Sequence, residues 1–469
     1  MAGLHALSAA QLGRAYAARE LSPLEVAREV IAHLQAWEPQ LRATWAFDAS
    51  EALSMAAESE ARWMRGQARG PLDGVPLTIK ENIATRGLAM PLGTAASRLV
   101  PSAVDAPPAA RMREAGAVFL ARTTMPDYGM LSSGLSSFHP LTRNPWDLRR
   151  NPGGSSAGAA AAAAAGYGPL HLGTDVGGSI RLPAHWCGVV GFKPSAGRVP
   201  IHPPYLGRVA GPMTRTVEDA ALAMTVLSRA DSRDATSLPA QDIDWLDLPR
   251  EPTPLLRGMK LGLLLDAGWG LPLDPEIAAA VNAAAALLAD AGANVQALPP
   301  FTTRAMADGI NLFWQLRSWR EIGTLPPNRQ ALVLPYIREW AAAAQACSAT
   351  QLLDAYHQFA TLRDATVLAC EPFDAVLSPV APVRAYAAVA ASPTGDPLRA
   401  MEHIAHTLPY NMSGQPAISL PCAHDAADMP IGLQIIGRRH DDLGVLRLAR
   451  AWELLRPAQA IRPWPAPPA

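Results

Sequence analysis

Two glycine-rich turns that each carry a serine stand out in the sequence, together with one lysine upstream of them. The turns span Gly153–Ser156 and Gly173–Ser179, and Lys80 follows the apolar run Val75–Ile79. A serine hydroxyl is a poor nucleophile until a base removes its proton. Histidine usually does this, but no histidine here lies in a convincing motif, and a neutral lysine can serve instead. These residue types therefore predict acyl transfer by a serine nucleophile.

Lys80 ends a run of residues that is typical of a buried strand. Burial penalises the charged ammonium, so it lowers the pKa of a lysine and favours the neutral amine that can accept a proton. Glu81 need not face Lys80, because adjacent strand residues point to opposite faces. A lysine considered alone is more often a surface residue at a strand end. The two serine turns favour the catalytic interpretation.

The second turn places Gly177 and Gly178 directly before Ser179. Glycine lets the backbone bend so that successive N–H groups converge on an anion. Such donors would stabilise the oxyanion that forms when the Ser179 hydroxyl attacks a carbonyl. Either turn taken singly is more often a phosphate loop or a plain turn, and Ser155 or Ser156 has the alternative role of helix N-cap.

Residues Gly154–Gly158 match G-x-S-x-G, the nucleophile elbow of α/β-hydrolases, which would make Ser156 the nucleophile. That motif requires a strand immediately before it. Here the preceding segment, 144–152, carries two prolines and two asparagines and is typical of a loop. The elbow interpretation is therefore disfavoured.

Strand and helix patterns alternate along most of the chain, which predicts an α/β fold whose sheet is covered by helices on both faces. Apolar periodicity and turn residues predict helices at 8–40 (two helices, the second with a capping box at Ser22–Glu25), 50–67, 111–115, 156–165 and 276–291, mostly helix over 301–365, and strands at 75–79, 116–120, 171–173, 259–265, 294–298, 374–377 and 431–436. The proline-rich segments 200–204 and 249–254 are expected to be loops, and 462–468 a frayed tail.

The bulk composition excludes several classes of protein. The chain has 469 residues, a formal net charge of −1 and no long basic run, so nothing favours a nucleic acid or an anionic membrane as partner. The apolar run Ala157–Ala165 is too short to span a bilayer. The first residues, Met1–His5, lack the pattern of a signal peptide. Four scattered cysteines without a C-x-x-C pair indicate reduced thiols in a cytoplasmic protein with no zinc or redox motif; they are Cys187, Cys347, Cys370 and Cys422.

The chain resembles the amidase signature family over nearly its whole length. The resemblance is carried by 74–81, 144–158, 173–194 (GTDVGGSIRLPAHWCGVVGFKP), 211–213, 411–417 and 432–437. It implies a single large α/β domain, residues 1–469, with a central mixed β-sheet covered by helices on both faces. It also implies N-terminal helices over 1–69, a signature core over about 70–220, a variable substrate-covering region over about 300–365 and a C-terminal part of the core over about 366–455.

The resemblance implies a role for each residue of the two turns. Ser179 is expected to be the acylated nucleophile, Lys80 the general base, and Ser155, after a cis peptide bond, the relay between them. The remaining implied roles are an oxyanion hole from the N–H groups of Val176, Gly177, Gly178 and Ser179, and an acyl pocket lined by Gly129 and Met130. No metal or organic cofactor is needed for this chemistry. For Met130, simple core packing is an equal alternative.

Other conspicuous residues have structural alternatives. Asp175 and Arg181 flank the nucleophile, and an internal ion pair is favoured over direct catalysis. Core packing is favoured over substrate contact for the three tryptophans of the variable region, Trp314, Trp319 and Trp340. Cys187 suits a small buried residue rather than a second nucleophile.

Three functions remain compatible with these residues. The first is an amidohydrolase that cleaves a small-molecule carboxylic amide, or a related carbamate or ester. The alternative is a glutaminase (A-type) subunit of a tRNA-dependent amidotransferase, which would need a partner and an ammonia tunnel. An inactive scaffold must explain why Lys80, Ser155 and Ser179 are all intact. A homodimer is compatible with the family, although the sequence carries no interface signal.

Overall fold

A computed structural model of the chain describes residues 3–458 and 462–468. The first two residues of Met1–His5, the segment that lacks the pattern of a signal peptide, lie outside the described part. A single mixed sheet of eleven strands crosses the molecule in the order β1-β3-β2-β4-β6-β5-β10-β11-β9-β7-β8. Its strands are β1 (Thr44–Trp45), β2 (Pro76–Lys80), β3 (Val118–Thr123), β4 (Leu170–Asp175), β5 (Val190–Lys193), β6 (Val209–Thr214), β7 (Lys260–Leu263), β8 (Asn294–Ala297), β9 (Ala375–Pro379), β10 (Ala417–His424) and β11 (Pro430–Gly437).

The sheet contains two groups of parallel strands separated by antiparallel ones, and β1 pairs antiparallel with β3 at one end. Strand β2 runs parallel to both β3 and β4, and β7 runs parallel to β8 and β9. The strands between these two groups pair antiparallel, from β4 through β6, β5, β10 and β11 to β9. The carboxyl ends of β2 and β4 therefore lie side by side, and they deliver Lys80 and Asp175 to the same edge. Ligands commonly bind at such an edge in open α/β sheets.

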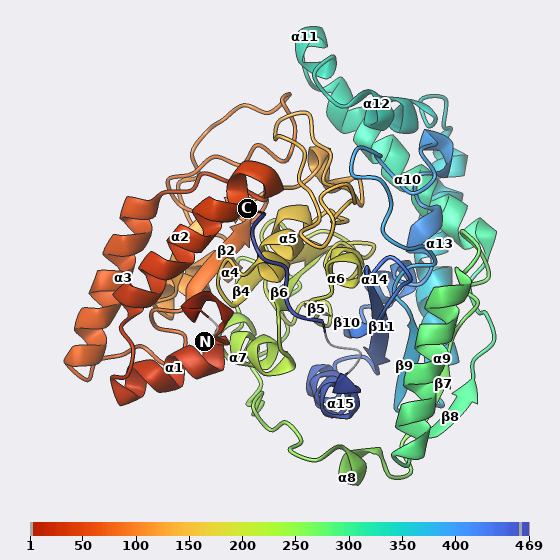
Figure 1. Cartoon of the computed structure of the whole chain (residues 1–469). Helices are drawn as coiled ribbons and strands as arrows, with labels where there is room; N and C mark the ends of the chain where they lie inside the picture. Colours follow the sequence, from red (N-terminus) through yellow and green to blue (C-terminus); the bar gives the residue numbers. More distant parts are fainter. Residues whose placement is uncertain (1–2, 459–461, 469) are drawn as a thin grey trace.

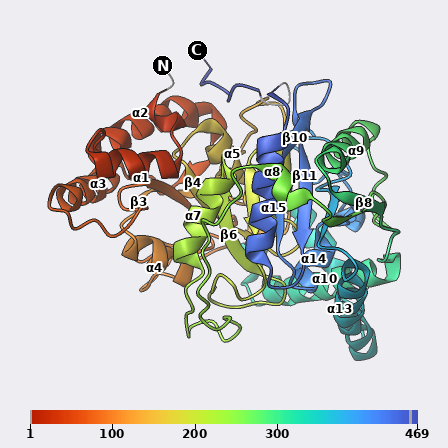
Figure 2. The same ribbon diagram turned by 90° about the horizontal axis from the view of Figure 1, so that it is seen from below.

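Helices cover both faces of the sheet. Helices α5 (Ala157–Ala165) and α6 (Arg181–Cys187) lie on one face, and α7 (Val217–Leu227) and α15 (Asp442–Leu455) lie on the other. Seen from below, α7 and α15 are in front of the strands (Figure 2). The main hydrophobic core lies between this second face and its helices and includes Leu172, Phe192, Leu433 and Trp452.

The predicted alanine helix is α5, and all of its residues are buried. Its small side chains allow the helix to approach the sheet closely. A Cβ atom on Gly158 would lie 2.1 Å from the Ala43 carbonyl oxygen, and one on Gly173 would lie 2.8 Å from Ser156 Oγ. The first serine turn is therefore held against the strand that carries the second. Gly166 ends the helix in the left-handed conformation, as predicted.

The N-terminal helices form one flank of the molecule, and a separate group of helices forms the opposite upper flank (Figure 1). The first group is α1 (Ala9–Ala18), α2 (Pro23–Leu41) and α3 (Ala49–Met64), followed in the chain by α4 (Pro107–Glu114); the second is α10 (Arg304–Gly323), α11 (Pro327–Gln330), α12 (Pro335–Ala342) and α13 (Ala349–Cys370). The remaining α-helices of the described residues are α8 (Pro252–Leu256), α9 (Pro275–Asp290) and α14 (Leu408–Met412), and four short 3-10 helices lie at Leu4–Ala6, Asp127–Gly129, Pro397–Arg399 and Glu402–Ile404. The predicted cap at Ser22 is confirmed, since its hydroxyl accepts from the amides of Leu24 and Glu25. The full capping box is not formed among the described residues, because the Glu25 side chain does not accept from the Ser22 amide.

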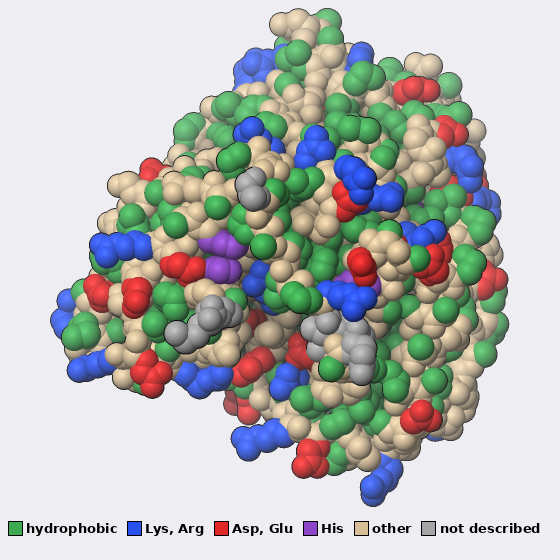
Figure 3. All heavy atoms as spheres, viewed as in Figure 1, with side chains coloured by type: hydrophobic (Ala, Val, Ile, Leu, Met, Phe, Trp, Pro, Cys, Tyr) green, Lys and Arg blue, Asp and Glu red, His purple; other side chains and the backbone are tan. Residues whose placement is uncertain are grey.

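The face of the molecule in Figure 3 carries acidic and basic side chains intermingled, with apolar side chains scattered between them. This pattern agrees with the balanced net charge of −1. Within the described residues, no helix combines the length and the apolar character that crossing a bilayer requires.

Candidate active site

Lys80 lies at the buried end of β2, as predicted, and its side chain is fully enclosed. Its Nζ donates to three hydroxyl oxygens: Ser155 Oγ at 2.8 Å, Thr174 Oγ1 at 3.0 Å and Ser156 Oγ at 3.1 Å. The neighbouring Glu81 carboxylate instead contacts His139 Nε2 at 2.8 Å. The lysine therefore reaches hydroxyls from both serine turns.

Burial lowers the pKa of Lys80 well below its ordinary value of 10.5. The positive charge of Arg208 lowers this pKa further, and the carboxylates of Asp175 and Glu81 partly oppose the shift. This environment favours the neutral amine, which is the form that can remove a proton from a hydroxyl.

The peptide bond between Gly154 and Ser155 is cis, as the family resemblance implied. Ser155 Oγ lies next to Lys80, and Ser155 and Ser179 both line one cavity. The next residue, Ser156, connects the two turns. Its amide donates to the Ser179 carbonyl at 3.1 Å, and its hydroxyl bonds to the amide and carbonyl of Thr174.

Ser156 is the N-cap residue of α5, but its side chain makes no capping hydrogen bond. It is fully buried, and its hydroxyl is occupied by Thr174 and Lys80. Ser179 is only partly buried and faces the cavity. This geometry supports Ser179 rather than Ser156 as the nucleophile and disfavours the elbow interpretation of Gly154–Gly158.

The second turn exposes fewer backbone donors than expected. The Gly178 amide donates to Asp175 Oδ1 at 2.7 Å, and the Ile180 amide donates to Asp175 Oδ2 at 3.1 Å. Within the described chain, the amides of Val176, Gly177 and Ser179 have no hydrogen-bond acceptor. Of the four predicted oxyanion donors, Gly178 is thus already engaged, because the turn folds around the Asp175 carboxylate.

Asp175 and Arg181 form a fully buried ion pair, in agreement with the favoured structural interpretation. Two arginine nitrogens, Nη2 and Nε, each lie 3.0 Å from a carboxylate oxygen. Asn411 Nδ2 donates to the same carboxylate at 2.9 Å, and Gln434 Oε1 accepts from Arg181 at 2.8 Å. These contacts connect the nucleophile turn to β11 and α14 and hold the pKa of Asp175 below its usual range.

A cavity of about 430 Å³ opens in front of Ser155 and Ser179. Gly129 and Met130 both line it, and a Cβ atom on Gly129 would lie 3.2 Å from Ser155 Oγ. Their predicted contact with an acyl group stays a prediction. Most of the wall is apolar or aromatic; it includes Met90, Leu92, Met125, Tyr128, Met130, Leu131, Leu182, Tyr205, Trp314, Met401 and Ile404. The charged residues of the wall are Arg208, Arg317 and Glu321.

The three tryptophans of the variable region have different environments. Trp314 lines the cavity, and its ring would lie 3.3 Å from a Cβ atom on Gly177, so it covers the nucleophile turn. Trp314 is also buried within a hydrophobic core cluster, so core packing is confirmed for it, and contact with a substrate stays a prediction. Trp340 is buried in the core and donates to Asn311 Oδ1, whereas Trp319 is exposed.

A family model described as "Amidase" matches residues 25–446. The chain belongs to the amidase signature family. It is 34% identical over 473 residues to the A-type subunit of glutamyl-tRNA(Gln) amidotransferase from Picosynechococcus sp., covering 93% of this chain and 95% of that protein. A bacterial aryl acylamidase of the same family superposes with a TM-score of 0.87 at 30% identity, covering 98% of this chain and 99% of the other. The peptide amidase from Stenotrophomonas maltophilia superposes with a TM-score of 0.84 at 26% identity and 99% coverage of both chains.

Three polar residues of this candidate site were missed by the sequence interpretation. Thr174 Oγ1 accepts from Lys80 and also from Asn82 Nδ2 at 3.0 Å. Arg208 Nη2 donates to the Asn82 carbonyl at 3.1 Å. Asn82 lies two residues after Lys80, and Thr174 lies within the turn Gly173–Ser179, so their positions in the sequence could have indicated a place in the site. Arg208 lies in a segment of proline and glycine with no such signal.

We expect Arg181→Met to lower the free energy of unfolding by about 3–5 kcal/mol, because the Asp175 charge would remain buried without its partner. The matched control is Arg363→Met, which breaks an exposed pair with Asp364 and should cost less than about 1 kcal/mol. Urea unfolding of both variants measures the difference. Equal, small losses would contradict the structural role of the buried pair.

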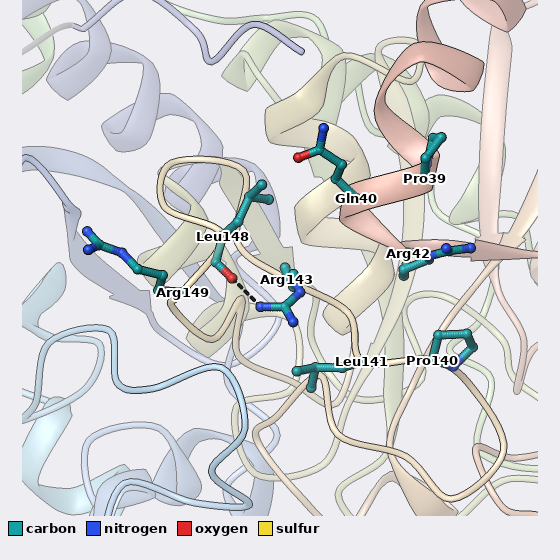
Figure 4. A pocket seen from close by; sticks show the side chains of 8 residues that line it. All are labelled: Pro39, Gln40, Arg42, Pro140, Leu141, Arg143, Leu148 and Arg149. Carbon is teal, nitrogen blue, oxygen red and sulfur yellow. Dashed lines mark hydrogen bonds between the residues drawn. The ribbon is translucent and has the colours of Figure 1, made fainter. Parts of the chain in front are cut away.

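A second hollow of about 480 Å³ lies between the end of α2 and the 140–149 loop (Figure 4). It is lined by Pro39, Gln40, Arg42, Pro140, Leu141, Arg143, Leu148 and Arg149. Arg143 donates to the Leu148 carbonyl at 2.7 Å across this hollow. None of the catalytic candidates lines it. Elsewhere in residues 3–458 and 462–468, no three His, Cys, Asp or Glu side chains converge as a metal site would require.

Proposed function

We propose that this protein hydrolyses a carboxylic amide, or a related carbamate or ester, through an acyl-enzyme on Ser179. The observation that carries the proposal is the environment of Lys80. Its amine is fully buried, is bonded among the described residues only to hydroxyls, and contacts Ser155, which shares a cavity with Ser179. A neutral amine in this position can act as a general base.

The reaction would begin with two coupled proton transfers. Lys80 Nζ takes the Ser155 hydroxyl proton while Ser155 Oγ takes the proton of Ser179, and Ser179 Oγ attacks the carbonyl carbon. The amides of Val176, Gly177 and Ser179 stabilise the resulting oxyanion, since they have no protein acceptor within the described chain. Collapse expels the amine, which receives a proton back through Ser155. Water, activated by the same chain of groups, then cleaves the Ser179 ester and releases the acid.

The cavity supports an amide with an apolar or aromatic group. Methionine, leucine and aromatic side chains dominate its wall, and Trp314 lies over the nucleophile turn. The aryl acylamidase and the peptide amidase that superpose on the chain are named for the cleavage of amides, which is consistent with this proposal.

A second candidate function is that of a glutaminase subunit in an amidotransferase. It is favoured by the relative from Picosynechococcus, which is named as part of an amidotransferase. Its identity of 34% exceeds that of either superposed amidase. The proposed chemistry at Ser179 is the same for both functions. They differ in the substrate and in the need for a partner.

An assay of the purified chain without other subunits distinguishes the amide hydrolase from the glutaminase subunit. We expect it to hydrolyse anilides, carbamates or esters from a panel graded by acyl size, with Ser179→Ala as the inactive control. L-Glutamine belongs in the same panel. Ammonia release from glutamine that requires added subunits, without turnover of any other substrate, would overturn the first function and support the second.

A further inference from the structure

We propose that Arg208 selects an amide that carries a carboxylate group, an inference that rests on the proposed amide hydrolysis. Arg208 lies just before β6, and its neighbour Val209 pairs with Asp175 across the sheet. Its side chain lines the same cavity as Ser155 and Ser179. It therefore presents a positive charge to the space where the substrate would lie.

Within the part of the chain that the structure describes, the guanidinium of Arg208 has no acidic partner. It donates to two neutral acceptors, the Pro203 carbonyl at 3.0 Å and the Asn82 carbonyl at 3.1 Å. Among the described residues, no carboxylate forms an ion pair with its nitrogens. By contrast, buried Arg181 and Arg198 are each paired with an aspartate at 3.0 Å. A guanidinium that is partly buried without a counter-charge is costly unless an anion is supplied.

Several other arginines of the described chain that are buried or partly buried also lack a carboxylate partner, but they do not line the cavity. The two with the most enclosed positions, Arg215 and Arg122, are explained by their surroundings. Arg215 donates to the Ala163 and Ala164 carbonyls at the C-terminal end of α5, where a cation is favoured. Arg122 packs against the ring of Phe119. Neither lines the cavity. Arg208 differs from both because its charge faces the candidate substrate site.

The other charges of the cavity leave it with a positive excess. Arg317 and Glu321 lie one turn apart on α10, and the Arg317 guanidinium stacks 3.8 Å from the centre of the Tyr205 ring. Both of these side chains are exposed, whereas Arg208 is partly buried. Two cations and one anion therefore line the wall, and Arg208 is the more enclosed of the cations.

Arg208 is also close to the reacting groups. Its partner Asn82 donates to Thr174 Oγ1, which accepts from Lys80 as well. A carboxylate bound to Arg208 would thus lie near the catalytic hydroxyls, on a substrate only a few bonds longer than the amide itself. Arginine binds carboxylates through two parallel N–H donors, so it would orient the substrate as well as attract it.

Matched substrate pairs test this inference. On the acyl side, succinanilic acid is compared with 4-methylpentananilide, in which an isopropyl group replaces the carboxylate. On the amine side, 4-acetamidobenzoate is compared with 4-isopropylacetanilide. We expect kcat/KM of the wild type to favour the carboxylate in one of the pairs by about 10-fold or more, as for a hydrogen bond to a charged group. The pair that responds identifies the side on which the carboxylate lies.

On the high-pH plateau of each enzyme, where Lys80 is neutral with or without Arg208, Arg208→Met should remove this preference. It should lower kcat/KM for the carboxylate by about 10- to 100-fold and for its uncharged counterpart by less than about 3-fold. Arg208→Lys should restore part of the preference. Arg143→Met is the matched control, since Arg143 also donates to a main-chain carbonyl but lines the second hollow instead. Equal losses on both members of a pair, or no preference in the wild type, would overturn the inference.

A binding measurement keeps the inference separate from the proposed function. In a Ser179→Ala background, calorimetry should show succinanilate or 4-acetamidobenzoate bound about 10-fold more weakly when Arg208 is also replaced by methionine. Unchanged affinity would refute the role of Arg208 whether or not any anilide is hydrolysed. Conversely, the enzyme could hydrolyse glutamine and no other substrate, and lose that activity in Arg208→Met. This result would support the role of Arg208 and overturn only the proposed function.

Discussion

Ser179→Ala is expected to abolish the acyl-enzyme and to lower kcat/KM by about 10⁴-fold or more. Ser179 combines a partly exposed hydroxyl in the cavity with neighbouring amides that have no acceptor in the described chain. Alanine removes the hydroxyl and leaves the turn otherwise intact. The Ser179 carbonyl, which accepts from the Ser156 amide, remains in place. The fold and the free energy of unfolding should therefore change little.

Mass spectrometry after treatment with a fluorophosphonate locates the nucleophile directly. We expect one adduct, on Ser179, that is absent from Ser179→Ala. Ser156→Ala should retain the adduct, although its activity falls because Ser156 contacts Lys80 and Thr174. Ser195→Ala, which removes a buried hydroxyl without a described partner, serves as the control for loss of a serine. An adduct on Ser156 would overturn the assignment and revive the elbow interpretation.

The parts of the fold that sequence reasoning predicted are those with strong local signals. The apolar run before Lys80 predicted β2, and the alanine run ended by a glycine predicted α5. Strands β1, β5, β6 and β10 were missed. Strands β6 and β10 each contain an internal proline, and both are held by pairing with distant strands, β6 with β4 and β10 with β11. The segment 249–254 was predicted to be a loop, but Pro252 begins the short helix α8, where proline suits the first turn.

The residues of the candidate site also divide into those that the sequence predicted and those that only the structure could place. Lys80, Ser155 and Ser179 are residue types that indicate acyl transfer by a serine nucleophile. The glycine-rich turns and the strand end in which they lie can be recognised in the sequence. The use of the Gly178 amide by Asp175 depends on the folded shape of the turn, so no pattern could reveal it. The cavity wall combines residues from Asn82 to Ile404, brought together only by the sheet and α10. Arg208 and Trp314 could be placed there only by the structure.

Lys80→Met is expected to lower kcat/KM by about 10²- to 10⁴-fold, because the general base is lost while the side chain keeps its length. In the wild type, kcat/KM should rise with pH as Lys80 loses its proton and then level off. The midpoint should lie well below the ordinary lysine value of 10.5, since burial and Arg208 both lower this pKa. Arg208→Met should move the midpoint to higher pH, because one of these causes is removed.

The same substitution of Lys80 should increase stability, and the gain should depend on pH. The folded pKa of Lys80 lies below that of the unfolded chain, so between the two values the unfolded state binds more protons. The free energy of unfolding of the wild type therefore rises with pH in this range, by up to about 1.4 kcal/mol per unit. Lys80→Met lacks this dependence, so its advantage should be largest at low pH and shrink as the pH approaches the ordinary lysine pKa.

Urea unfolding at about pH 6, 7.5 and 9, with activity profiles over the same range, measures both effects. Lys260→Met provides the control, because Lys260 is an exposed lysine on β7 and its removal should alter neither profile. A stability difference that does not change with pH would mean that Lys80 is charged in the folded protein. Residual activity of Lys80→Met with an unchanged ascending limb would assign the base to another group. The two measurements together test whether burial, rather than an acidic partner, makes this lysine a base.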